Sequence, residues 1–201
     1  MRTPVAFVDA NILFSRTLCD WLFLLRLETN GGMFVLFSSE DSITETLYNL
    51  RRRNPSADGS LTSNRQQLLR RSLDDILDSF SGDVDFPGLD KNDHHVHAAA
   101  LECHARYLIA NDQGFAEIEP DLLPYEAHTA DSFLMLIAAN APTAVDAVIT
   151  RQLRHYADKP ASKPLDVALV DAGCPPACQG WVSPPVHSKF ASQGVEGSLV
   201  Q

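Results

Sequence analysis

The sequence predicts an α/β fold: a three-layer α/β/α sandwich with a mainly parallel central sheet, followed by a C-terminal helical extension. Short and nearly continuous apolar runs, such as residues 4–8, are typical of strands buried on both faces of a parallel sheet. These runs alternate with longer segments of helical periodicity, as expected for repeated strand–helix–strand units. The hydrophobic fraction of 45% is ordinary for a globular protein with a real core.

The first part of the chain is expected to alternate between strands and helices. Apolar residues from Leu18 to Leu25 recur at helical spacing, and residues 30–32, Asn-Gly-Gly, end that helix. Ser38 and Ser39 offer an N-cap for the next helix, whose apolar stripe contains Ile43. The expected elements are strands at 4–8 and 33–37 and helices at 11–28, after residue 39, and at 63–80.

The second part repeats this alternation and then becomes helical. Asp93 is expected to open a helix whose inner face carries Val96 and the neighbouring alanines. A strand at 107–110, an edge strand at 126–129 and helices from residue 131 onward should follow, with a break at 140–142 and a last short helix at 165–172. We therefore divide the chain into a domain at 1–134 and a helical extension at 135–201, which ends in a loosely ordered tail.

The charge of the chain is strongly acidic overall, at −10, which argues against a non-specific nucleic-acid binder. Its distribution is uneven, because six arginines between residues 51 and 71 precede seven aspartates between residues 72 and 93. One interpretation is a basic flank that holds phosphates beside an acidic site, with Arg52 and Arg70 as RNA contacts. The other is a pair of solvated, charged helix faces.

Neither a membrane span nor a secretory signal is expected. No run approaches the roughly 18 apolar residues of a spanning helix, and the N-terminus leads directly into the first strand without a cleavage site. We therefore expect a cytoplasmic protein that does not contact a membrane. Cys174 and Cys178 form the only close cysteine pair, which leaves a disulfide or a metal clip open, although no second pair has zinc-ligand spacing.

Four carboxylates occur where a strand ends or a helix begins, and they are the candidate catalytic residues. They are Asp9, Glu45, Asp93 and Asp112. Since strand ends and helix starts of a parallel sheet meet at one edge, we expect these side chains to converge. Converging carboxylates need a cation to remain ionised together, and hard oxygen ligands suit Mg²⁺ or Mn²⁺. The simplest chemistry for such a site is metal-assisted phosphodiester hydrolysis.

Each acid also has an ordinary structural interpretation. Asp9 and Asp93 are well placed to cap helices, Glu45 could be a solvent-facing helix residue, and Asp112 could be a turn aspartate.

Four further residues are candidates for a supporting role. Asn11 could orient Asp9, and Asp90 takes the place of Asp93 if the helix starts earlier than expected. His94 or His95 could contact a substrate phosphate at the mouth of the site. The ordinary interpretations are a helix-start residue, a turn residue and surface histidines.

Four segments resemble, in the right order, the motifs of PIN-domain ribonucleases of the kind found as VapC-type toxins. The segments are Val8-Asp9-Ala10-Asn11-Ile12-Leu13, Thr44-Glu45-Thr46-Leu47, Asp93-His94-His95-Val96-His97-Ala98-Ala99-Ala100 and Leu108-Ile109-Ala110-Asn111-Asp112-Gln113-Gly114-Phe115. The resemblance covers residues 4 to 134. It implies a PIN-like nuclease domain in which Asp9, Asp93 and Asp112 bind Mg²⁺ or Mn²⁺ and Glu45 completes the catalytic set.

The resemblance also implies an activity and partners. The chain would be an endoribonuclease that leaves a 5′-phosphate and a 3′-hydroxyl, and the toxin of a type II toxin–antitoxin system. Its partners would be an RNA substrate and a cognate antitoxin protein. A homodimer is also expected, with the helices around Leu22 and Leu50 as contact surfaces.

Two other functions stay open at this stage. Ala110 and Gly114 depart from the family pattern, in which a hydroxyl residue and a polar residue are usual, so a catalytically weak module that binds RNA or a protein partner is the alternative. A phosphohydrolase with an aspartyl-phosphate intermediate is disfavoured, because Asp9-Ala10-Asn11 lacks the second aspartate such enzymes use.

Overall fold

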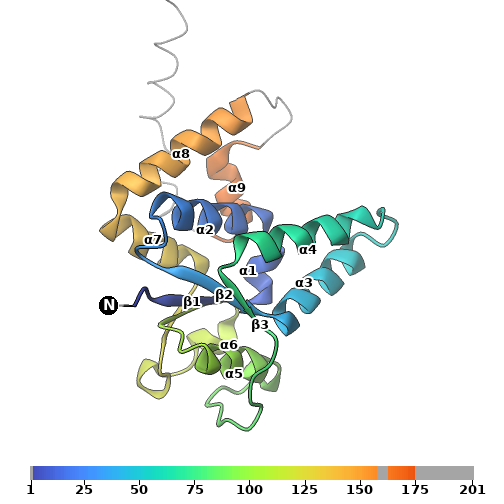
Figure 1. Cartoon of the computed structure of the whole chain (residues 1–201), viewed down its shortest axis with the longest axis vertical. Coiled ribbons are helices and arrows are strands. Elements are labelled where there is room, and N and C mark those ends of the chain that lie inside the picture. Colours follow the sequence, from blue (N-terminus) through green and yellow to red (C-terminus); the bar gives the residue numbers. More distant parts are fainter. Residues whose placement is uncertain (1, 158–162, 175–201) are drawn as a thin grey trace, which may run out of the picture.

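The centre of the molecule is a five-stranded, all-parallel sheet in the order β3-β2-β1-β4-β5 (Figure 1). A computed structural model describes residues 2–157 and 163–174. The strands are β1 (Val5–Val8), β2 (Val35–Ser39), β3 (Asp75–Leu77), β4 (Tyr107–Ile109) and β5 (Glu126–His128). The predicted α/β class and parallel sheet are thus confirmed, and β1 is the central strand.

Helices cover both faces of this sheet, which gives the predicted three layers. Ala6 and Val8 pack into one hydrophobic cluster with α2, α7 and α8, whereas Phe7 points the other way into a cluster with α5. This alternation follows from the two-residue period of a strand. The helices of the first cluster and the pair α5 and α6 lie on opposite sides of the strands in Figure 1.

The helix predicted at 11–28 is two helices, α1 (Ala10–Phe14) and α2 (Arg16–Glu28). Ser15 separates them, with an extended backbone and a side chain that accepts a hydrogen bond from the Leu18 N–H at 3.3 Å. A serine in this position offers the chain a new N-cap, so the helix restarts in another direction. Helical periodicity alone did not reveal the break, because apolar residues continue on both sides of it.

The prediction of one helix at 63–80 is wrong in its second half. Helix α4 (Ser60–Ser72) stops early, and residues 75–77 form the edge strand β3. The Asp74 carboxylate fixes this strand, since it accepts hydrogen bonds from Leu36 N–H at 2.9 Å and from Arg26 Nε at 3.0 Å. Leu73 and Ile76 suit a helix face and a short strand equally well, so tertiary contacts decide between helix and strand here.

The remaining elements follow the predicted order. Ser39 caps α3 (Glu40–Arg53) through Ser42 N–H, as expected. The predicted strands at 107–110 and 126–129 are β4 and β5, and β5 is an edge strand. The intervening helices are η1 (Lys91–Asp93), α5 (His94–Glu102), α6 (Gln113–Ala116) and η2 (Pro120–Leu122).

The C-terminal helices are α7 (Ala130–Asn140), α8 (Pro142–Ala157) and α9 (Leu165–Asp171), with the predicted break between the first two. Residue 134 lies inside α7, and buried residues of all three helices share one cluster with α1 and α2. Leu22 itself is buried in this core at 2% exposure, so a dimer contact through its helix would have to use other side chains. Cys178 and the rest of the tail lie outside the described residues.

In the described part of the chain, no single helix is both long and apolar enough to cross a membrane. The pair α7 and α8 reaches the required length and composition only when joined across a 117° bend.

Candidate functional site

The predicted acids converge at the carboxyl edge of the sheet, where β1 and β4 lie side by side. The chain runs outward from β1 to β2 and β3 and then returns to β4 beside β1, so this edge is the topological switch point. A cleft of about 520 Å³ opens there. It is lined by Asp9, Asn11, Glu45, Asp90, Asn92, Asp93, His95, Val96 and Asp112.

Asp9 directly follows β1 and is only 7% exposed. One carboxylate oxygen, Oδ1, accepts a hydrogen bond from Ala10 N–H at 2.6 Å, so Asp9 caps α1 while it lines the cleft. Burial, together with the nearby Glu45, raises the pKa of Asp9 to about 6, although the Ala10 hydrogen bond and His95 oppose the rise. A buried carboxyl with a raised pKa in a cleft is a functional-site candidate.

Asp93 is the last residue of η1 and precedes α5, but its side chain makes no capping hydrogen bond. Its Oδ2 atom is buried without a hydrogen-bond partner among the described residues. Burial raises the pKa of Asp93 to about 6, with smaller contributions from the negative charges of Asp112, Asp90 and Asp9 and an opposing one from His95. The capping interpretation therefore does not account for this residue, and the unsatisfied oxygen indicates a missing partner.

Gly114 allows Asp93 and Asp112 to approach one another. Asp112 caps α6 through a 2.7 Å hydrogen bond from Gly114 N–H to its Oδ1. A Cβ atom on residue 114 would lie 2.2 Å from Asp93 Oδ2 and 3.3 Å from Asp112 Oδ1. The glycine that departs from the family pattern is thus required by the packing of these two acids in this chain.

Glu45 reaches the rim of the cleft from α3, and its side chain is 49% exposed. The helix is held there because Thr46 Oγ1 donates to Ala10 C=O at 3.2 Å and Ser38 Oγ donates to Val8 C=O at 2.8 Å. The Nε2 atom of His95 lies 3.9 Å from Glu45 Oε2. Glu45 and His95 thus form an acid–imidazole pair at the rim of the cleft.

Two further residues line the cleft: His95, which was predicted as the alternative to His94 at its mouth, and Asn92, which was not predicted. His95 Nδ1 contacts Asn92 C=O at 2.7 Å, which fixes the imidazole over the start of α5. Their position beside Asp93 was the available signal, since residues flanking a helix start lie at the same sheet edge as the start itself.

Asn11 and Asp90 line the cleft in supporting positions. Asn11 Oδ1 accepts from Asn111 N–H at 3.0 Å, so it joins the segment after β1 to the segment after β4. Asn111 Oδ1 in turn accepts from Ala130 N–H at 2.8 Å. Asp90 Oδ1 accepts from Asn92 N–H at 2.9 Å and caps η1.

Three predicted contact residues lie elsewhere. His94 Nε2 contacts Val84 C=O at 2.9 Å, outside the acidic cleft. Arg70 forms an ion pair with Glu40 at 2.8 Å. Arg52 is exposed near the end of α3 and does not line the cleft.

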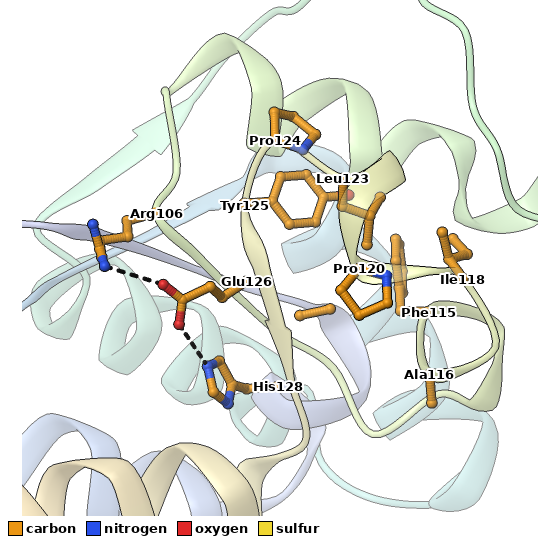
Figure 2. Close-up of a pocket in the computed structure, with 11 residues that line it drawn as sticks. Arg106, Phe115, Ala116, Ile118, Pro120, Leu123, Pro124, Tyr125, Glu126 and His128 are labelled. Carbon is orange, nitrogen blue, oxygen red and sulfur yellow. Dashed lines mark hydrogen bonds and ion pairs between the residues drawn. The ribbon is translucent and has the colours of Figure 1, made fainter.

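Another pocket, of about 440 Å³, lies beside the edge strand β5 and contains none of the predicted acids. Figure 2 shows Glu126 between Arg106 and His128, with which it pairs at 3.1 Å and 3.6 Å. Apolar side chains, among them Phe115 and Tyr125, form much of the rest of the lining. Because its charges pair with one another, this pocket lacks the unbalanced charge of the acidic cleft.

The side chains of the acidic cleft are of the chemical type that binds a hard divalent cation. Asp9, Asp93 and Asp112 supply carboxylate oxygens, which Mg²⁺ and Mn²⁺ prefer. The unpartnered Asp93 Oδ2 is the type of atom a cation would satisfy. Across residues 2–157 and 163–174, however, no group of three or more His, Cys, Asp or Glu side chains is arranged to hold a metal ion as it stands.

No protein-family model, curated protein or solved structure matches this chain. The function must therefore be inferred from the chemistry of the site.

Proposed function

We propose that this chain is a metal-dependent endoribonuclease that hydrolyses RNA phosphodiester bonds. The observation that carries the proposal is the convergence of Asp9 and Asp93, two carboxyls with raised pKa values, one of which has an unpartnered buried oxygen. Crowded acids are unfavourable for the fold by themselves, and a divalent cation relieves this cost. A phosphodiester is the substrate that such a cation site suits best.

Each residue has a distinct part in this proposal. Asp9, Asp93 and Asp112 would hold Mg²⁺ or Mn²⁺, which supplies Lewis-acid polarisation of a phosphate oxygen and a lower pKa for the attacking water. Glu45, exposed at the rim and 3.9 Å from His95, is placed to accept the proton of that water at Oε2. Asn11 keeps the β1 and β4 ends in register through Asn111.

The finer assignment rests on the resemblance to PIN-domain ribonucleases. By that resemblance the chain is the toxin of a type II toxin–antitoxin system, acts in the cytoplasm and is inhibited by a cognate antitoxin protein. The fold supports it to the extent that a parallel sheet brings the four motif acids to one cleft. A homodimer is part of the same proposal.

The direct test is cleavage of total cellular RNA by the purified protein with Mn²⁺, Mg²⁺ or EDTA, beside Asp9→Asn. We expect cleavage with either metal, loss in EDTA, and a reduction of at least about a hundredfold in the variant, since one metal-binding carboxylate is removed. Intact RNA with the folded wild-type protein and Mn²⁺ would contradict the proposal.

The alternative is a catalytically weak module that binds RNA or a protein partner. Two observations favour it: the absence of a ready metal-binding group in the described residues, and the buried Ala110, which lacks the hydroxyl usual in the family. Calorimetric titration with Mn²⁺ separates the two proposals. A nuclease should bind Mn²⁺ with Asp93-dependent affinity, whereas a non-catalytic module should show no dependence on Asp93.

A further inference from the structure

A second cavity, of about 680 Å³, adjoins the acidic cleft. Asn92 and His95 line both spaces, so the two are neighbours at the start of α5. Residues 84–91 form the other wall. Its volume falls in the range of small-molecule sites.

The loop that forms this cavity is built into the fold. His94 Nε2 contacts Val84 C=O at 2.9 Å, and the His97 ring hydrogen bonds to the backbone of Asp85. At Gly88 the chain passes so close to the Phe86 ring that a Cβ atom would lie 2.4 Å from its Cζ. The cavity therefore has a defined floor and wall.

The lining combines apolar faces with a polar edge. Phe86 is half-buried, with its ring centroid 5.1 Å from that of His97, and lines the cavity. Leu89 lines the cavity and is 92% exposed, so its side chain is accessible to a ligand. Asp85 offers a carboxylate acceptor and Lys91 offers a cation.

These groups suit a flat ligand with apolar faces and N–H donors on its edge. A nucleobase has both, since its faces stack on aromatic and apolar side chains and its edge can donate to a carboxylate. Asp85 repels a phosphate from its edge of the cavity, so we expect the base and not the backbone to face this side chain. Lys91 can then face a neighbouring phosphate.

We propose that this cavity is a base-binding subsite for a single-stranded RNA nucleotide beside the scissile phosphate. The base lies between Leu89 and Phe86, and Asp85 favours bases that carry an exocyclic amine. The inference rests on the proposed nuclease function and adds a source of sequence preference to it.

Photocrosslinking and cleavage test the subsite separately. A short single-stranded RNA containing iodocytidine is irradiated with the full-length protein in EDTA, and the crosslinked peptide is identified by mass spectrometry. The same proteins then cleave total RNA in Mn²⁺, and the bases beside each cut are sequenced. The variants are Leu89→Ala and Asp85→Asn, and the control is Leu27→Ala, a leucine 51% exposed on α2.

We expect the crosslink to lie within residues 84–95. The crosslink yield should fall about fivefold in Leu89→Ala, because an apolar contact to the base is lost. In Asp85→Asn we expect a changed base preference beside the cut. Leu27→Ala should match the wild type. A crosslink elsewhere, or equal behaviour of Leu89→Ala and Leu27→Ala, overturns the subsite even if RNA is cleaved. A crosslink at Phe86 without any cleavage supports the subsite and rejects the nuclease.

Discussion

Asp9 shows how one residue combines a structural and a chemical role. Its Oδ1 caps α1 at 2.6 Å, while its position after the central strand places the carboxyl in the cleft. The cap stabilises the negative charge, but burial and Glu45 destabilise it by more, which is why the pKa is raised to about 6. The same carboxylate therefore weakens the metal-free fold at neutral pH, and in the proposed nuclease it would contribute affinity for a cation.

Asp9→Asn should stabilise the metal-free protein at pH 7 while abolishing cleavage. Removing a buried charge whose pKa is raised from 3.8 to about 6 should increase the free energy of unfolding by up to about 3 kcal/mol. Urea unfolding in EDTA measures this. Asp83→Asn, an exposed acid outside the cleft, is the control and should change little. A less stable Asp9→Asn protein would contradict the electrostatic account.

Gly114→Ala should damage the site although it adds only one methyl group. The new Cβ would lie 2.2 Å from Asp93 Oδ2, so the acids must move apart. We expect about 1–3 kcal/mol of destabilisation and a reduction in cleavage of at least about tenfold.

Gly82→Ala is the matched control, because a Cβ there meets no atom within 4 Å. Both proteins are compared by urea unfolding and RNA cleavage. Equal activity of the two variants would show that the close approach at Gly114 is unimportant.

At the scale of elements, short segments are decided by single polar side chains. Ser15 divides one amphipathic stretch into α1 and α2, and this turn lets Ala10–Phe14 pack on α3 beside the cleft. Asp74 converts the end of another helical pattern into β3 by supplying the acceptor that Leu36 N–H needs. In both cases a hydrogen bond outweighs hydrophobic periodicity, because an unpaired buried backbone group is costly.

Asp74→Ala should loosen the β3 edge of the sheet. It removes the acceptor for Leu36 N–H and the ion pair with Arg26, so the free energy of unfolding should fall by about 1–3 kcal/mol. Asp78→Ala, an exposed residue just after β3, should change it by less than about 0.5 kcal/mol. Hydrogen exchange at Leu36 N–H should accelerate only in Asp74→Ala. Unchanged exchange there would mean that β3 does not depend on this carboxylate.

At the scale of the whole molecule, the strand order positions the site. The central strand β1 has β2 on one side and β4 on the other, so acids from separate parts of the chain meet at one edge. Two hydrophobic clusters on opposite faces hold the sheet in place behind that edge. The burial of this core offsets the unfavourable crowding of the carboxylates. Because the carboxylates titrate, their crowding makes the stability of the protein depend on pH.

The metal-free protein should lose stability as the pH rises from about 4 to about 6, relative to Asp9→Asn/Asp93→Asn. Asp9 and Asp93 have pKa values of about 6 in the folded chain, against 3.8 ordinarily, so the folded state binds more protons in this window. Stability is then highest below the ordinary pKa and stays reduced above the raised one.

Unfolding in urea across this pH range, with and without Mn²⁺, measures the effect. Saturating Mn²⁺ should restore stability above pH 6, because the cation binds the ionised carboxylates of the folded state. Parallel pH profiles for the wild type and the double variant would refute the raised pKa values.

The sequence by itself determined the fold class, the parallel strands β1, β2, β4 and β5, and which acids belong to the cleft. Strand ends of a parallel sheet must meet at one edge, so Asp9 and Asp112 could be placed from their local patterns alone. The tertiary structure decided β3, the break at Ser15, the place of His95 in the cleft and the need for glycine at 114. Each of these depends on a partner distant in the chain or on interatomic distances of a few ångströms, which a linear pattern does not encode.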